Sequence, residues 1–114
     1  MSRAVIVVVD DMFFASKIRA VAEAVGVEIS FPRTKEAVVE KAREASLILV
    51  DLHNQKMDPL ALARELPGVK LIGFFSHVHT ELQRSAIAAG YDRVIPRSVF
   101  VRELPKILNA DYTD

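Results

Sequence analysis

The chain has 114 residues, about half of them hydrophobic and a quarter charged, with a formal net charge of zero. This length allows one domain with a single core, and we expect residues 1–114 to form it. Balanced charge without a basic run argues against a nucleic-acid partner, and the absence of cysteine excludes a disulfide scaffold, a thiol nucleophile and a cysteine zinc site.

The first predicted strand is the apolar run 4–9, which ends in two acids, Asp10 and Asp11. An unbroken apolar run that is rich in β-branched residues favours the interior of a parallel sheet. Residues 12–25 follow with apolar side chains at helical spacing. Gly26 then occupies the position of a left-handed helix cap, so we expect the helix to end there.

The second strand is predicted over residues 27–31, where polar and apolar side chains alternate. Alternation is typical of a strand that is exposed on one side, and this one is therefore expected at an edge of the sheet. Pro32 ends it. Thr34 is a good N-cap for a helix that runs to about Ala45.

The run 46–52 predicts a third, fully buried strand that carries the carboxylate of Asp51 to its end. Charging the end of a buried strand is costly unless the carboxylate has partners or a function. A polar loop follows. Asp58 and Pro59 then predict the start of a third helix, because they supply an N-cap acceptor and a first-turn proline; we expect this helix to end at Pro67 and Gly68.

The fourth strand is predicted over residues 69–75 and ends at Ser76. Residues 80–83 match a capping box headed by Thr80, which opens a helix that closes at Gly90. A short edge strand over 93–96 and a last helix over about 100–108 complete the chain.

Five strands that alternate with five helices predict an α/β fold, with a parallel sheet, right-handed crossovers and helices on both faces. The apolar runs belong in the centre and the short or alternating strands at the edges. A flavodoxin-like, doubly wound sheet in the order 2-1-3-4-5 satisfies this pattern. In such a sheet the site lies beyond the carboxyl ends of strands one and three, so we expect Asp10, Asp11 and Asp51 in one acidic pocket.

Three carboxylates in one pocket repel one another and favour a hard cation. Oxygen ligands at a partly hydrated site suit magnesium, which makes Asp10, Asp11 and Asp51 the predicted metal ligands. Asp51 could then attack phosphorus as a nucleophile and form an acyl phosphate. Ser76 and Arg97, after strands four and five, are placed to bind the transferred phosphoryl oxygens.

This combination resembles the receiver domain of two-component response regulators (CheY-like), and the similarity covers nearly the whole chain. The matching positions are Asp10-Asp11, Asp51 within Val-Asp-Leu, Met57-Asp58-Pro59, Ser76, Ala89-Gly90 and Arg97. Arg97 lies seven residues after Gly90, where the family has a lysine. A competing register aligns the family's Lys-Pro with Ile95-Pro96 and leaves the cation without a counterpart.

The resemblance implies a stand-alone signalling module rather than an enzyme, in which Asp51 accepts a phosphoryl group with the help of Mg²⁺. The expected donors are a histidine kinase or a histidine phosphotransfer protein. A downstream protein would bind the face formed by residues 80–89 and 93–108. Since the sequence has neither a signal peptide nor an apolar run long enough to span a bilayer, we expect a cytoplasmic location and no membrane partner.

Three departures from the family pattern support an alternative, a pseudo-receiver that binds other proteins without being phosphorylated. Arg97 keeps the charge of the family's lysine but not its geometry. His77 follows Ser76 where the family has a small residue. Val94 occupies the position in which the family often has an aromatic switch residue.

Simpler interpretations exist for each candidate. Asp10 and Asp11 could cap the first helix, Asp51 could be kept for hydrogen bonds, Ser76 could be a turn residue and Arg97 a surface cation. The loop histidines at the same end of the sheet could hold zinc; these are His53, His77 and His79. Five phenylalanines are expected in the core, namely Phe13, Phe14, Phe31, Phe74 and Phe75.

Overall fold

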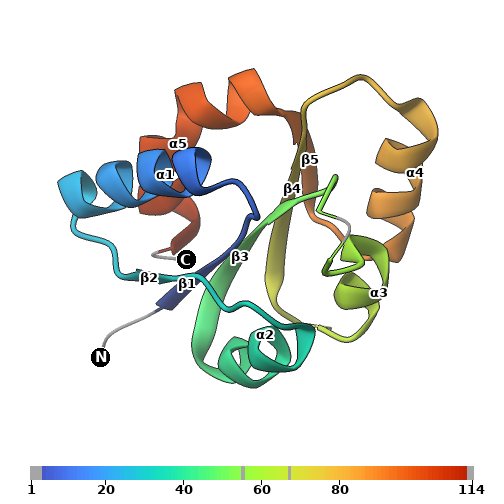
Figure 1. Ribbon diagram of the computed structural model, residues 1–114, viewed down its shortest axis with the longest axis horizontal. Helices are drawn as coiled ribbons and strands as arrows, with labels where there is room; N and C mark the ends of the chain where they lie inside the picture. Colours follow the sequence, from blue (N-terminus) through green and yellow to red (C-terminus); the bar gives the residue numbers. More distant parts are fainter. Residues whose placement is uncertain (1–3, 55, 67, 113–114) are drawn as a thin grey trace.

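The computed structural model describes residues 4–54, 56–66 and 68–112, and the side chains among these up to Asn109. Its centre is a sheet of five parallel strands in the order β2-β1-β3-β4-β5 (Figure 1). The predicted order and the predicted edge strands are therefore confirmed. The strands are β1 (Ala4–Val8), β2 (Ile29–Ser30), β3 (Ala45–Asp51), β4 (Lys70–Phe75) and β5 (Arg93–Pro96).

Helices cover both faces of the sheet, as the alternating pattern predicts (Figure 1). Two of them, α1 and α5, pack on one face, and the other three pack on the opposite face. The helices are α1 (Met12–Val25), α2 (Lys35–Lys41), α3 (Pro59–Arg64), α4 (Thr80–Ala89) and α5 (Arg97–Tyr112). A short 3-10 helix, Ala42–Glu44, joins α2 to β3. No helix in the described part of the chain has the length and hydrophobicity needed to cross a bilayer.

The sheet separates two hydrophobic cores, because successive residues of a strand face opposite sides. The core between the sheet and the two helices α1 and α5, which we call the α1–α5 core, contains a cluster of three phenylalanines. Phe74 stacks on Phe100 with ring centroids 4.3 Å apart, and Phe14 lies 5.3 Å from Phe74. The α2–α4 core, on the other face, is filled mainly by aliphatic side chains such as Ile48, Leu62 and Leu71.

Most of the predicted helix boundaries are correct. Gly26 ends α1 in the left-handed region at φ 75°, and the Thr34 hydroxyl accepts a hydrogen bond from the Ala37 N–H at 3.0 Å. Asp58 caps α3 by accepting from the Ala61 N–H at 3.3 Å, although it does so with an uncommon positive φ of 47°. The helix α3 ends earlier than expected, at Arg64. The predicted stop at Pro67 lies outside the described residues.

The capping box predicted for α4 is wrong. The N-cap is His79, whose Nδ1 accepts a hydrogen bond from the Leu82 N–H at 3.1 Å. Thr80 is therefore the first helical residue, and its hydroxyl does not cap the helix. An imidazole nitrogen without a proton is a competent acceptor, but the usual cap preferences do not include it.

Two further expectations needed correction. Phe13 is 91% exposed, because the cap at Asp11 starts α1 at Met12 and turns Phe14, one position later, towards the sheet. Phe14, Phe74 and Phe75 are buried as expected, and Phe31 is partly buried.

The helix α5 starts at Arg97, earlier than predicted, and it contains Pro105 in its interior.

Candidate functional site

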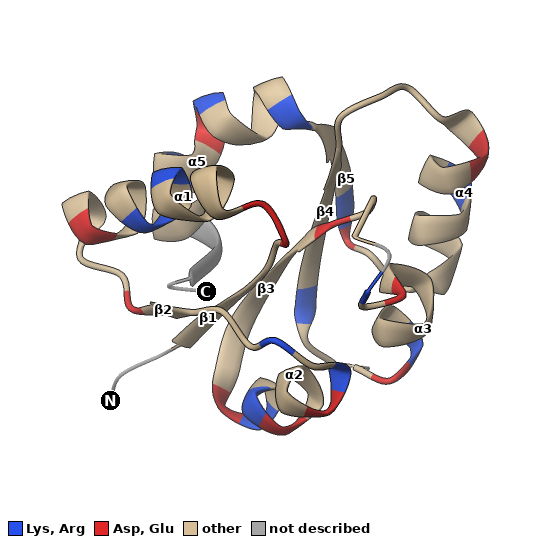
Figure 2. Ribbon diagram, viewed as in Figure 1, with Lys and Arg blue, Asp and Glu red and all other residues tan. Residues whose placement is uncertain are grey.

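Three carboxylates lie at the carboxyl ends of the neighbouring strands β1 and β3. Val8 and Val50 are partners in the parallel register, so the acids that follow them reach the same edge of the sheet. Figure 2 shows acidic segments at both strand ends on that edge. Asp10, Asp11 and Asp51 line one pocket of about 380 Å³. The structure thus brings together acids that are forty positions apart in sequence.

Asp11 has two structural partners. Its Oδ1 accepts hydrogen bonds from the N–H groups of Phe13 and Phe14 at 2.9 and 3.2 Å, so Asp11 is the N-cap of α1. Its Oδ2 lies 3.6 Å from Nη2 of Arg97. The simpler interpretation, an acid that caps the first helix, therefore holds for Asp11, but one oxygen still faces the pocket and a cation.

Arg97, in the first turn of α5, lies beside one acid of the pocket, Asp11. Its guanidinium carbon lies 3.8 Å from the centroid of the Phe14 ring, and its Nη2 lies 3.6 Å from Oδ2 of Asp11. A cation at a helix N-terminus is opposed by the helix dipole. The carboxylate of Asp11 and the π face of Phe14 offset that opposition, and they hold the guanidinium beside the acids.

Asp10 is paired with a cation from a different element. Nζ of Lys56, in the loop between β3 and α3, lies 3.3 Å from Oδ1 of Asp10. Both side chains are well exposed, so the pair contributes little to stability. Asn54 shapes this loop: its side chain is buried, and its Oδ1 accepts a hydrogen bond from the Lys56 N–H at 3.0 Å.

Asp51 is the last residue of β3 and is partly buried. Its Oδ1 accepts a hydrogen bond from the N–H of His53 at 2.9 Å, which closes a turn of the following loop. None of the groups that the structure describes is hydrogen-bonded to Oδ2. One oxygen of Asp51 is thus held by the backbone, and the other remains available to a ligand.

Ser76 and His77 follow β4 at the same edge of the sheet. Ser76 is exposed and comes two residues after Phe74, the register partner of Asp51. The ring of His77 lies edge-on to that of His53, with centroids 5.9 Å apart. Two imidazoles therefore stand against each other beside the acidic pocket.

A ready-made cluster of metal ligands is absent from the described residues: no three His, Cys, Asp or Glu side chains are grouped closely enough to hold an ion. The histidine hypothesis has no support here, since Nδ1 of His79 already caps α4. The carboxylates have the all-oxygen chemistry that magnesium prefers, and magnesium needs only one or two carboxylates when waters complete its shell. The donor set fits magnesium better than zinc.

Comparison with known proteins identifies the fold. No protein-family model and no curated protein matches the sequence. Among solved structures, a CheY-like response regulator receiver domain from Methanospirillum hungatei superposes with a TM-score of 0.82 at 21% identity, covering 99% of this chain and 95% of that one. A response regulator from Thermotoga maritima gives 0.78 at 18% identity, with both chains fully covered. This chain has the receiver fold.

A third structure with the same fold contains a bound magnesium ion. The receiver domain of a sensor histidine kinase from Pseudomonas aeruginosa, solved with a magnesium ion in its active-site cleft, gives a TM-score of 0.81 at 17% identity and covers both chains completely. The predicted fold is thereby confirmed. At such identities the similarity establishes the receiver fold, and what this chain does must be argued from its own residues.

Sequence reasoning missed three residues of the site. In the sequence, Lys56 and Asn54 are only members of a polar loop, and Phe14 is only an expected core residue. The loop does follow a buried strand that ends in an acid, which marks it as part of the site edge. Lys56 pairs with Asp10 because of the path that the loop takes in space. The spacing of residues in the sequence does not predict that path.

Proposed function

We propose that this chain is a response-regulator receiver domain that accepts a phosphoryl group on Asp51 in a magnesium-dependent phosphorelay. The observation that carries the proposal is the shared pocket of Asp10, Asp11 and Asp51, with Arg97 held against its rim. The receiver fold also supports the proposal, because a site in this fold is expected at the same edge of the sheet. In this proposal the domain is a signalling module and not a conventional enzyme.

Oδ2 is the oxygen of Asp51 that attacks, because Oδ1 is engaged by the His53 N–H. The Oδ2–P bond forms while the bond between phosphorus and the donor breaks, and its electron pair leaves with the donor. The product is an acyl phosphate on Asp51. Asp10, Asp11 and Asp51 would hold Mg²⁺, whose charge offsets that of the phosphoryl oxygens.

Arg97 and Ser76 are the remaining groups in this proposal. The guanidinium of Arg97 can donate two hydrogen bonds to the phosphoryl oxygens, and the Phe14 ring and Asp11 orient it for that purpose. The Ser76 hydroxyl is a donor for another phosphoryl oxygen. Lys56 would exchange its contact with Asp10 when Asp10 turns to the ion, which costs little because the pair is exposed.

Partners follow from the same chemistry. A histidine kinase or a histidine phosphotransfer protein would supply the phosphoryl group. We infer that α4, β5 and the first part of α5, residues 80–89 and 93–108, carry the signal to a downstream protein. Arg97 begins α5, so a phosphoryl group that draws Arg97 from Asp11 would act directly on that face.

The test is to incubate the protein with Mg²⁺ and a small acyl-phosphate donor and to measure its intact mass. We expect an adduct of one phosphoryl group that is lost in Asp51→Asn and when Mg²⁺ is chelated. Asp58→Asn is the matched control, because asparagine caps helices as well as aspartate and also tolerates positive φ. An adduct that persists in Asp51→Asn would contradict the assignment of Asp51.

A second candidate function is a pseudo-receiver that binds partner proteins without phosphorylation. The observation that favours it is the contact between the rings of His53 and His77 beside the pocket. This pair would obstruct a donor that approaches Asp51. If the wild-type protein gains no adduct, and His77→Ala restores it, the histidine pair blocks the site and the pseudo-receiver is the better description.

A further inference from the structure

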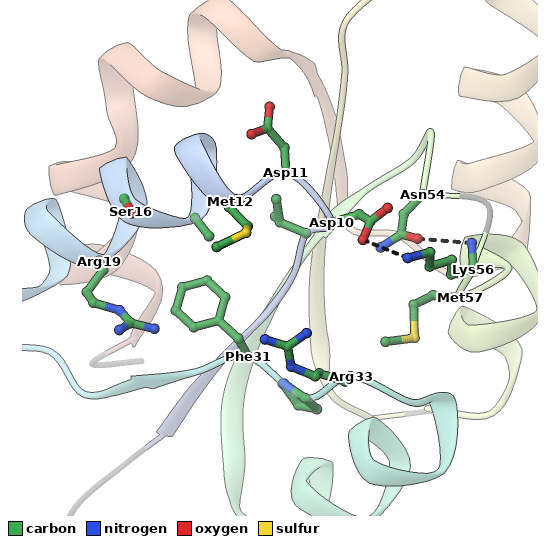
Figure 3. A pocket seen from close by; sticks show the side chains of 13 residues that line it. Asp10, Asp11, Met12, Ser16, Arg19, Phe31, Arg33, Asn54, Lys56 and Met57 are labelled. Atoms are coloured by element: carbon green, nitrogen blue, oxygen red, sulfur yellow. Dashed lines mark hydrogen bonds and ion pairs between the residues drawn. The ribbon is translucent and has the colours of Figure 1, made fainter.

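A second hollow adjoins the acidic pocket on its β2 side and shares Asp10 and Asp11 with it, and the function proposed above does not use its opposite end. Its volume is about 290 Å³. Four segments line it: the residues after β1, the first turns of α1, the residues after β2 and the loop between β3 and α3 (Figure 3). The acids Asp10 and Asp11 lie at one end, and Arg19, Phe31 and Arg33 lie at the other. We call this second end the arginine end.

The charges of the hollow are unevenly matched. Asp10 is paired with Lys56 at 3.3 Å, and Asp11 faces Arg97 at 3.6 Å. Arg19 and Arg33 have no ion pair with any residue that the structure describes. In a chain of zero net charge, the arginine end therefore has an excess of positive charge next to carboxylates that are already neutralised.

The arginine end also offers planar groups, a guanidinium and the aromatic ring beneath it. The guanidinium carbon of Arg19 lies 4.9 Å from the centroid of the partly buried Phe31 ring. Figure 3 shows the Phe31 ring between the guanidinium groups of Arg19 and Arg33, and Met12 also lines the hollow. A planar ring can stack on such groups, and stacking on aromatic side chains does not depend on the base.

We propose that this hollow binds a nucleotide, with the base against Phe31 and Arg19 and the phosphate on Arg33. A guanidinium recognises phosphate with two parallel hydrogen bonds, and Arg33 has no competing carboxylate among the described residues. The volume lies near the lower limit of ligand pockets, about 300 Å³, which suits a mononucleotide and is too small for a dinucleotide. The site does not use Asp51.

The experiment is an NMR titration of the isotope-labelled full chain, without Mg²⁺, with AMP, GMP, CMP and UMP in turn. We expect saturable shifts at residues of α1 and of the segment after β2. Arg33→Ala should weaken binding at least about tenfold, the loss of one or two charge-assisted hydrogen bonds, and Phe31→Leu should weaken it as well. Arg102→Ala is the matched control, because Arg102 is an exposed arginine on α5 and should leave binding unchanged.

Two ligand fragments separate the parts of the proposal. Inorganic phosphate and adenosine should each bind more weakly than AMP. Phosphate that binds as tightly as AMP would show that the ring surface plays no part. No shift with any of the four nucleotides at millimolar concentration, or equal binding to Arg33→Ala and wild type, would overturn the proposal. Asp51→Asn should bind AMP like the wild type, so this test is independent of phosphoryl acceptance.

Discussion

The two hydrophobic cores of this molecule are filled in different ways. In one of them, a core residue contacts the cation that faces Asp11 of the acidic pocket. On the α1–α5 face, three phenylalanine rings pack together, and the outermost, Phe14, carries the guanidinium of Arg97. On the α2–α4 face the packing is mainly aliphatic, and Gly73 leaves room for Leu52. The aromatic cluster positions the guanidinium of Arg97 beside Asp11, whereas the aliphatic face mainly supports the sheet.

The neighbours Gly73 and Phe74 in β4 show the contrast most directly, since their side chains point to opposite faces. Phe74 fills its face with a large ring, whereas a Cβ at Gly73 would crowd the side chain of Leu52 on the other face. Substitutions at these positions, and at one polar contact on each face, test whether the two cores differ in this way. The expected effects below run from the largest to the smallest.

Phe74→Ala should have the largest effect. Phe74 is fully buried and contacts both Phe14 and Phe100, so its removal leaves a cavity in the aromatic cluster. We expect the free energy of unfolding to fall by about 3–5 kcal/mol, a large share of the total for a domain of this size. Urea denaturation measures it, and a loss below about 1 kcal/mol would mean that the cluster collapses around the gap.

Gly73→Ala should be the next largest, and it acts through overpacking. A Cβ at this position would lie 2.8 Å from Cδ2 and 3.0 Å from Cγ of Leu52, which is itself buried. We expect a loss of about 1–3 kcal/mol in the free energy of unfolding. A second substitution, Leu52→Val, should recover part of it. If Gly73→Ala alone were as stable as the wild type, Leu52 would be freer to move than the packing indicates.

Tyr91→Phe removes the polar contact of the α2–α4 face. The buried Tyr91 hydroxyl donates a hydrogen bond to the carbonyl oxygen of Pro59 at 2.9 Å, and its loss should cost about 1 kcal/mol. Burial, and secondarily the nearby Asp58, raise the pKa of Tyr91 above its ordinary value of 10.0. The folded protein therefore keeps the phenol proton at a pH where the unfolded chain loses it.

The pH dependence of the same variant has a definite sign. Above pH 10.0 the folded state binds more protons at Tyr91 than the unfolded state does, so stability should decline as the pH rises further. Below that pH Tyr91 contributes no slope. In Tyr91→Phe this alkaline decline should be shallower. Chemical denaturation at a series of pH values measures it, and an unchanged slope would contradict the raised pKa.

Arg97→Ala should have the smallest effect on stability, although Arg97 is central to the proposed function. The contact with Phe14 should contribute about 0.5–1 kcal/mol, and the half-exposed pair with Asp11 adds little. Arg102→Ala should be neutral by comparison. A double-mutant cycle with Phe14→Leu isolates the coupling of Arg97 to the aromatic cluster. Additive effects would show that the cation is not held by the ring.

Much of the fold could be predicted because its signals are local. The apolar runs of β1, β3 and β4 and the caps at Thr34, Asp58 and Gly26 depend on residues close in sequence. The errors came from positions where neighbours in space decide. Helix α4 starts at an imidazole cap that no preference scale ranks, and α5 begins directly after β5 with no cap signal in the chain.

The sequence by itself determined the alternation of strands and helices, and with it the edge of the sheet at which Asp10, Asp11 and Asp51 meet. Parallel strands joined by right-handed crossovers leave no other place for residues at their carboxyl ends. Only the tertiary structure decided which cation faces which acid, Lys56 with Asp10 and Arg97 with Asp11. Long side chains reach across the paths of loops and helix ends, and hydrophobic periodicity contains no information about those paths.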